Sequence, residues 1–205
     1  MARKFLEKKR GTGKKAAKPL IILIAEGQNE TEKNYFSQFR KQNSSFNIKI
    51  LKSGWATDPR RMLKAIELYW KENELSEEKG DQGYVVLDLD CDEKKAKLVE
   101  KLQNGSENNI RFIVSNPCFE VWFLLHYQCS THIYADGNEV IRDLRKYISN
   151  YQKNTDVFSI LSVNLDKALK NADKLVAHFN KMGCPWPSDK CNPRTDAPEI
   201  VKKLI

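Results

Sequence analysis

The sequence has no apolar run long enough to cross a membrane. The longest uninterrupted run, Pro19 to Ala25, is far shorter than the roughly 20 residues of a spanning helix. No apolar stretch with a small-residue cleavage site directly follows the basic N-terminus, so we expect no secretory signal. We therefore expect a cytoplasmic protein without membrane contact, whose 205 residues suffice for one compact domain.

Paired cysteine motifs are also missing. None of the five cysteines belongs to a Cys-x-x-Cys pair, and such an odd, scattered set is more typical of a reducing cytosol than of a disulfide framework. His178, Cys184 and Cys191 could be imagined as zinc ligands, but their spacing fits no common zinc module. The sequence therefore favours unpaired cysteines and disfavours a structural zinc.

A true phosphate loop is absent, although Gly11 to Lys15 resembles one at first sight. The P-loop pattern needs Gly-x-x-x-x-Gly-Lys followed by Ser or Thr. Here Lys8 stands at the first glycine and Lys15 at the hydroxyl residue, and no apolar strand precedes the segment. We reject a nucleotide-binding role for it.

Acidic residues are scarce in residues 1–18, which we call the basic arm. Eight lysines and arginines accompany a single acid, Glu7, so the arm holds +7 of the net charge of +8. A flexible arm of this kind can bind phosphates by releasing counterions, with Lys14 and Lys15 as candidate nucleic-acid contacts. The alternative is a solvated tail that aids solubility, because charge alone does not identify an anion.

Apolar patterning alternates between strands and helices in residues 19–130. Three continuous apolar runs are typical of strands buried on both faces, and one alternating run indicates a half-exposed strand. Asp58-Pro59 and Asn116-Pro117 have the form of an N-cap followed by proline at the first helical position, and Thr31 is a further candidate cap. This order predicts an α/β fold with a mostly parallel sheet covered by helices on both faces. The expected strands cover residues 20–24, 46–50, 84–87 and 110–114.

Residues 131–205 have a different character. Helical apolar stripes recur in residues 140–148 and 165–179, a proline-containing loop covers residues 183–192, and a short helix follows Pro198. We expect a mainly helical extension of the same domain, which spans residues 19–205. Its amphipathic stripes exceed what one side of a small sheet needs, so we expect it to offer surface to a partner protein.

Acidic residues follow two of the predicted buried strands. Glu26 comes directly after the first, and Asp88 and Asp90 end the strand at residues 84–87. Ligands of open parallel sheets bind at the carboxyl ends of the strands, and residues i and i+2 point to the same side. Three converging carboxylates would repel one another without a cation, and their hard oxygen atoms suit Mg²⁺ or Mn²⁺. Each acid alone could instead cap or begin a helix.

Several longer segments carry a more specific signal. Ile22 to Gly27 is followed by Thr31-Glu32-x-x-Tyr35-Phe36, and Asp88-x-Asp90 follows an apolar strand. The block Ser115 to His126 reads Ser-Asn-Pro-Cys-Phe-Glu-x-Trp-x-Leu-Leu-His. From about residue 20 to the C-terminus, these segments resemble the RloB-like family in the family's own order. Further matches are Tyr151-x-Lys153, Ala168, Asn171-Ala172 and Asn192-Pro193-x-Thr195.

The resemblance implies a Toprim-type fold, the catalytic module of topoisomerases, primases and OLD-type nucleases. By position, it implies that Glu26 is a general acid or base and that Asp88 and Asp90 bind magnesium. It also implies an effector nuclease of prokaryotic anti-phage or abortive-infection systems, encoded beside an AAA or ABC-like ATPase that acts as its partner. The alternatives are a non-catalytic Toprim-like scaffold that regulates the ATPase and, with less support, nucleotidyl transfer of a primase kind.

The sequence departs from the family pattern in two places. Leu89 stands between the two aspartates where a basic or polar residue is usual, and Gln28-Asn29-Glu30 replaces a shorter loop that bears a lysine. Neither change removes a carboxylate.

Other residues of the matching segments have two interpretations each. Glu120 is a candidate catalytic residue or a first-turn acid that interacts with the helix dipole, and Asn116 is a candidate nucleic-acid contact or a helix cap. Lys153, with Tyr151, could bind a nucleic-acid backbone or only cover the surface. His126 lies near two turns along the predicted helix, which favours a structural role.

Removal of the basic arm should weaken nucleic-acid binding and flatten its salt dependence. For each phosphate that the shortened protein no longer neutralises, the slope of log K against log salt should fall by roughly 0.9 for duplex DNA. Fluorescence anisotropy with labelled duplexes at several salt concentrations measures both quantities. Unchanged affinity and slope would show that the arm is only a solvated tail.

Overall fold

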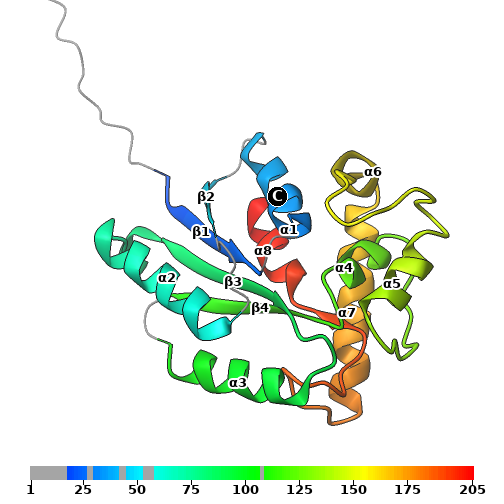
Figure 1. The fold of residues 1–205 in the computed structure, drawn as a ribbon. Coiled ribbons are helices and arrows are strands. Elements are labelled where there is room, and N and C mark those ends of the chain that lie inside the picture. Colours follow the sequence, from blue (N-terminus) through cyan, green and yellow to red (C-terminus); the bar gives the residue numbers. More distant parts are fainter. Residues whose placement is uncertain (1–17, 27–29, 42–44, 53–57, 107–108) are drawn as a thin grey trace, which may run out of the picture.

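The structure is a computed structural model that describes residues 18–26, 30–41, 45–52, 58–106 and 109–205. Most of the basic arm, with Lys14 and Lys15, lies outside the described residues, as do Gln28 and Asn29. Within the described ranges the chain forms five strands and eight α-helices, which confirms the predicted α/β class (Figure 1). No helix in these ranges is both long and apolar enough to cross a membrane.

The strands form one mixed sheet with the order β2-β1-β3-β4-β5. The first four strands pair in parallel, and the short β5 pairs with β4 in the antiparallel direction. The carboxyl ends of β1 and β3 are therefore neighbours in the centre of the sheet. The bounds are β1 (Leu20–Ala25), β2 (Asn47–Leu51), β3 (Gln82–Asp88), β4 (Ile110–Asn116) and β5 (Arg194–Thr195).

Alternate strand residues enter two separate cores, because successive side chains point to opposite faces of a sheet. One face packs against α2 (Pro59–Glu72) and α3 (Glu93–Asn104). The other face forms a larger core that includes α1 (Thr31–Gln38) and α4 (Glu120–Leu125). Its further helices are α5 (Gly137–Leu144), α6 (Phe158–Ser162), α7 (Leu165–Lys181) and α8 (Ala197–Leu204).

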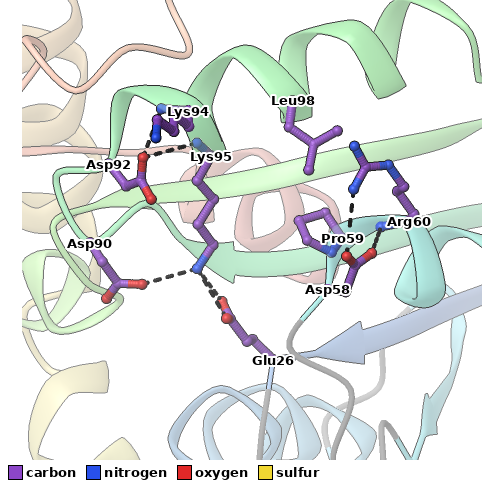
Figure 2. Close-up of a pocket in the computed structure, with 9 residues that line it drawn as sticks. All are labelled: Glu26, Asp58, Pro59, Arg60, Asp90, Asp92, Lys94, Lys95 and Leu98. Carbon is purple, nitrogen blue, oxygen red and sulfur yellow. Dashed lines mark hydrogen bonds and ion pairs between the residues drawn. The ribbon is translucent and has the colours of Figure 1, made fainter.

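One of the three expected helix caps is present. Asp58 accepts a hydrogen bond from the Arg60 backbone at the start of α2, as predicted (Figure 2), and a second one from the Arg61 backbone. Thr31 is instead the first residue of α1, and its Oγ1 accepts a hydrogen bond from the Asn154 backbone at 3.2 Å. Asn116 is the last residue of β4, so the prediction that it caps a helix is wrong as well. Both side chains are occupied by distant parts of the chain.

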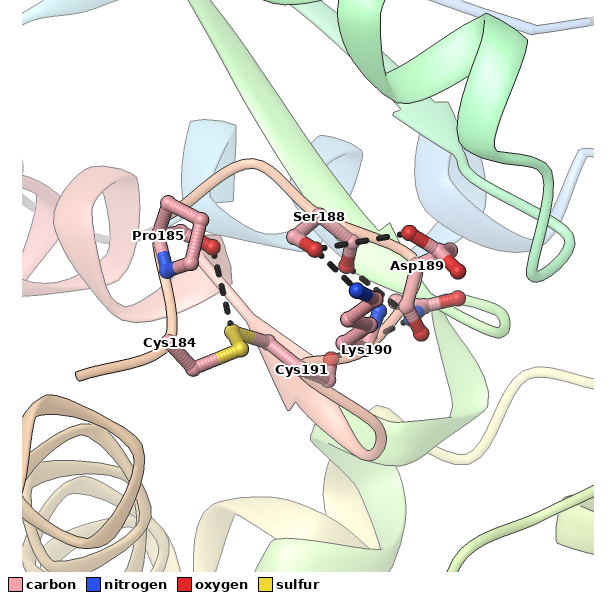
Figure 3. The surroundings of a disulfide bond; sticks show 7 residues. Cys184, Pro185, Ser188, Asp189, Lys190 and Cys191 are labelled. Carbon is pink, nitrogen blue, oxygen red and sulfur yellow. Dashed lines mark hydrogen bonds between the residues drawn. A yellow bond between two sulfur atoms is a disulfide. The ribbon is translucent and has the colours of Figure 1, made fainter. Parts of the chain in front are cut away.

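The proline-containing loop before β5 holds a disulfide between Cys184 and Cys191 (Figure 3). The prediction of unpaired cysteines is therefore wrong at this pair, and a zinc ion bound by both thiolates is excluded. The loop turns back on itself and brings the two Cα atoms to 6.3 Å, a proximity that spacing in the sequence does not reveal. The described cysteines outside this pair, Cys91, Cys118 and Cys129, are free.

Asn116 joins this loop to the centre of the sheet. Its Nδ2 lies 2.9 to 3.3 Å from the carbonyl oxygens of Ser188, Asp189 and Cys191, and its Oδ1 accepts from the Cys91 backbone at 3.1 Å. The side chain is fully buried. These contacts assign Asn116 a structural role: it holds the loop against the turn that follows β3.

Asn116→Ala should destabilise the fold by about 2 to 4 kcal/mol, because it leaves several buried backbone groups without a partner. The free energy of unfolding in urea measures the effect. Asn150→Ala, at an exposed position, is the matched control and should change stability by less than about 0.5 kcal/mol. Equal stability of the two variants would contradict the structural role.

Candidate functional site

The candidate site begins where β1 and β3 end side by side. Glu26 follows β1 directly, and its backbone N–H donates to the Val86 carbonyl at 3.1 Å, which continues the pairing with β3. The Asp88 backbone N–H in turn lies 3.3 Å from Glu26 Oε2. The two strands thus bring Glu26 and Asp88 to the same edge of the sheet, as the sequence predicts.

Glu26 and Asp90 meet at the ammonium group of Lys95. Lys95 Nζ donates to both Glu26 oxygens at 2.9 and 3.0 Å and to Asp90 Oδ2 at 3.0 Å (Figure 2). The side chains of Lys95 and Glu26 are only 15% and 19% exposed, whereas that of Asp90 is 66% exposed. One ammonium nitrogen therefore contacts both carboxylates.

Lys95 lies in the first turn of α3, from which its side chain reaches Glu26 and Asp90. Asp92 caps the helix by accepting hydrogen bonds from the backbone of Lys94 and Lys95. Burial disfavours the charged form of Lys95, but the attraction of Glu26 and Asp90 outweighs it and raises the pKa of the ammonium. Lys95 is therefore a cation that compensates the two carboxylates.

Asp88 alternates with Tyr84 and Val86 of β3, so its side chain belongs to the opposite face of the sheet, where α1 supplies Glu32 and α4 supplies Glu120. Burial, followed by the negative charges of Glu32 and Glu120, raises the Asp88 pKa well above its ordinary value. Burial is likewise the main cause that raises the Glu32 pKa to about 7. Glu120 begins α4 and accepts a hydrogen bond from the buried Tyr151 hydroxyl at 2.9 Å. We call Glu32, Asp88 and Glu120 the inner acids.

Two oxygen atoms of the inner acids have no partner. Glu32 Oε2 and Asp88 Oδ1 are buried, and no described residue forms a hydrogen bond with either. Glu32 is only 6% exposed, so its carboxyl group has little access to water. Buried oxygens of this kind need a proton or a bound cation.

Lys153 is an exposed lysine whose charge interacts with all three inner acids. Burial opposes its charge, but Glu120, Asp88 and Glu32 together raise its pKa. Its neighbour Asn154 bonds the backbone of Glu30 at 2.7 Å, as well as Thr31. The start of α1 thus holds Lys153 beside the acids, whereas Tyr151 is buried and does not belong to the surface.

The carboxylates do not form a finished metal centre. Across the described part of the chain, no three His, Cys, Asp or Glu side chains are arranged to hold a metal ion. The three acids expected at one point are separated into two groups. Glu26 and Asp90 share the ammonium of Lys95, whereas Asp88 belongs to the inner acids. The donor chemistry of these three acids still fits Mg²⁺ or Mn²⁺, since their ligand atoms are hard oxygens, Asp88 Oδ1 has no partner among the described residues, and Glu26 and Asp90 already bind a cation.

A cavity of about 560 Å³ opens beside Glu26 on the side of α2 and α3. Arg60, Lys94 and Lys95 line it together with Asp58, Asp90 and Asp92 (Figure 2). Its volume lies in the range of small-molecule sites, so a phosphate group with part of a sugar can enter.

Sequence reasoning missed two residues of this site. Glu32 shares a helix face with the buried Tyr35 and Phe36, and Lys95 lies three and four residues before Leu98 and Val99. In the sequence, the signal for both residues was a charged side chain within an apolar stripe.

His126 is fully buried at the end of α4, where its Nδ1 contacts the Trp122 carbonyl at 2.9 Å, and burial lowers its pKa to about 4.

Fold and site together define an α/β protein with carboxylates gathered at the carboxyl edge of a parallel sheet. The model of the RloB-like protein family matches residues 21–204, and the chain belongs to this family. No curated protein and no solved structure matches the chain.

Glu32→Gln should stabilise the metal-free protein at high pH. The carboxyl group titrates at about 7 in the folded state and near 4.5 when unfolded, so stability falls as pH rises from 4.5 to 7. Gln carries no charge, so the variant should be more stable than wild type by roughly 2 kcal/mol at pH 8 and similar to it below pH 4.5.

Urea unfolding in EDTA buffer at both pH values measures this difference. Glu100→Gln, at an exposed position on α3, is the control and should show the same small change at both pH values. A Glu32→Gln protein that is less stable than wild type at pH 8 would show that the Glu32 charge is compensated in the fold.

Proposed function

We propose that the protein is a divalent-metal-dependent nuclease that hydrolyses phosphodiester bonds of DNA or RNA. The observation that carries the proposal is the cation position between Glu26 and Asp90, at the carboxyl edge where the adjacent strands β1 and β3 end. A structural scaffold has no need for this concentration of carboxylates. Membership of the RloB-like family supports the proposal, since the family resemblance implies a Toprim-type catalytic module.

Glu26 and Asp90 would hold Mg²⁺ or Mn²⁺, and Asp88 would join them as a third ligand by turning its side chain away from the other inner acids. When bound, the ion would polarise a phosphate oxygen and lower the pKa of a water molecule. Glu26 lines the cavity, and in this proposal its carboxylate would accept a proton from an attacking water and return it to the leaving oxygen. Glu120 would complete the acidic site, and Tyr151 would keep its carboxylate oriented.

Basic side chains on both sides of the acids would bind the nucleic-acid backbone. Arg60 and Lys94 line the cavity near Glu26, and Lys153 lies exposed beside the inner acids. Phosphate contacts of this kind provide affinity without sequence selectivity. They are therefore compatible with DNA, tRNA or other RNA as substrate.

The biological role that we propose is an effector of prokaryotic defence against phage, controlled by an AAA or ABC-like ATPase. This part rests on the family resemblance. The helical region after residue 136 is the candidate contact surface, because Ile160 and Val163 are 52% and 83% exposed there.

A non-catalytic scaffold that regulates the ATPase is the second candidate. The contact that favours it is the Lys95 ammonium, which compensates Glu26 and Asp90 without a metal. A degenerate site could use such a salt bridge only to hold the fold together.

Cleavage by the wild-type protein should require Mg²⁺ or Mn²⁺ and disappear in EDTA. Asp88→Ala deletes an anionic ligand, and Glu26→Gln keeps the shape but removes the charge and the proton exchange. Each should lower turnover on the order of 10²-fold or more. The assay measures cleavage of plasmid DNA and total tRNA with the ATPase partner present.

Glu100→Gln is the control variant, and circular dichroism confirms that each protein is folded. Full cleavage activity of Glu26→Gln would contradict the proposal that Glu26 accepts and returns the proton. Absence of cleavage by wild type on both substrates would favour the scaffold.

A further inference from the structure

Lys95 uses its whole hydrogen-bonding capacity on the acidic site. An ammonium group has three donors, and Nζ makes three contacts, two with Glu26 and one with Asp90. The lysine side chain is largely buried, so few water molecules compete for these donors. Ion pairs at an exposed surface contribute little to stability, but the side chains of Lys95 and Glu26 are both largely shielded from solvent.

We propose that Lys95 is a resident counter-cation that a divalent metal ion must displace. In the metal-free protein its ammonium holds Glu26 and Asp90 together, and the metal enters by exchange with this ammonium. The inference rests on the proposed metal dependence of the site. It adds a residue with a defined positioning role, which neither the family match nor the expected carboxylates assign.

Exchange follows from the geometry and the charges. A bound Mg²⁺ lies about 2.1 Å from its oxygen ligands, whereas Nζ already lies 2.9 to 3.0 Å from the same oxygens. The position between Glu26 and Asp90 cannot hold both cations at once, because two cations at such close range repel strongly where the surroundings are partly buried.

The neighbouring cavity can receive the displaced ammonium. Lys95 lines it, and the side chains of Arg60 and Lys94 add positive charge on the same side. A lysine stem is long and flexible, so Nζ can move from the carboxylates into this space without a change in α3. There it faces any phosphate that binds at the site, so metal entry would also create a phosphate contact.

The resident ammonium should lower the apparent metal affinity, since only the fraction of molecules with Lys95 displaced can bind the ion. Lys95→Met keeps the stem and removes the cation. Lys95→Arg keeps the charge and can bond a carboxylate with two donors. Lys94→Met is the matched control, because Lys94 lines the same cavity while the ammonium that bonds Glu26 and Asp90 belongs to Lys95.

The test measures Mn²⁺ binding to the full-length protein by electron paramagnetic resonance of the free ion. Lys95→Met should bind Mn²⁺ at least about 10-fold more tightly than wild type, Lys94→Met within about 3-fold, and Lys95→Arg no more tightly than wild type. Equal or weaker binding by Lys95→Met would overturn the inference, and so would a gain of the same size in Lys94→Met.

A second measurement does not depend on the stability of a variant. In the wild-type protein, the ¹⁵N signal of the Lys95 ammonium should be visible without metal, protected from exchange, and should vanish or shift on saturation with Mg²⁺. An unchanged signal at saturation would overturn the inference.

The two proposals can fail separately. If Lys95→Met binds Mn²⁺ more tightly but the wild-type protein cleaves no nucleic acid, the counter-cation role of Lys95 stands and the nuclease proposal fails. If the wild-type protein cleaves nucleic acid with metal but Lys95→Met and wild type bind Mn²⁺ equally, the nuclease proposal stands and the counter-cation role of Lys95 fails.

Discussion

Mutual repulsion of carboxylates at one edge of the sheet is the constraint on which the site depends. Glu26 and Asp90 lie on one side of β1 and β3, and the inner acids lie on the other. Lys95 neutralises part of this charge on the first side and Lys153 on the second. Burial, together with the remaining negative charge, raises the pKa of Asp88 and of Glu32.

Much of the surrounding structure fixes these charges in place. The Asp92 cap starts α3 so that Lys95 points to the sheet, and Asn154 ties the Lys153 segment to the start of α1. Asn116 anchors the disulfide loop against the turn that carries Asp90. Such supporting contacts hold charged groups at positions that they would leave in solution. The site is therefore a product of the whole chain from β1 to β5.

The alternation of strands and helices could be predicted from the sequence, because buried parallel strands leave continuous apolar runs. The position of Glu26 and Asp88 at one edge follows from the same rule, since parallel strands share their carboxyl ends. Long-range contacts escaped prediction. Thr31 and Asn116 bond to residues far along the chain instead of capping helices, and β5 has only two residues. The division of the acids between two faces could not be foreseen, because Asp90 lies in a turn with positive φ where strand alternation no longer holds.

The central claim is that the cation position between Glu26 and Asp90 is a metal site that Lys95 occupies in the metal-free state. Crystals of the full-length protein grown without metal and then soaked in Mn²⁺ test this most directly, by anomalous scattering. We expect an anomalous peak in contact with Glu26 and Asp90, with Lys95 Nζ moved into the cavity lined by Arg60 and Lys94. The absence of a peak at saturating Mn²⁺, or a peak elsewhere with Lys95 still bonded to both carboxylates, would contradict the claim.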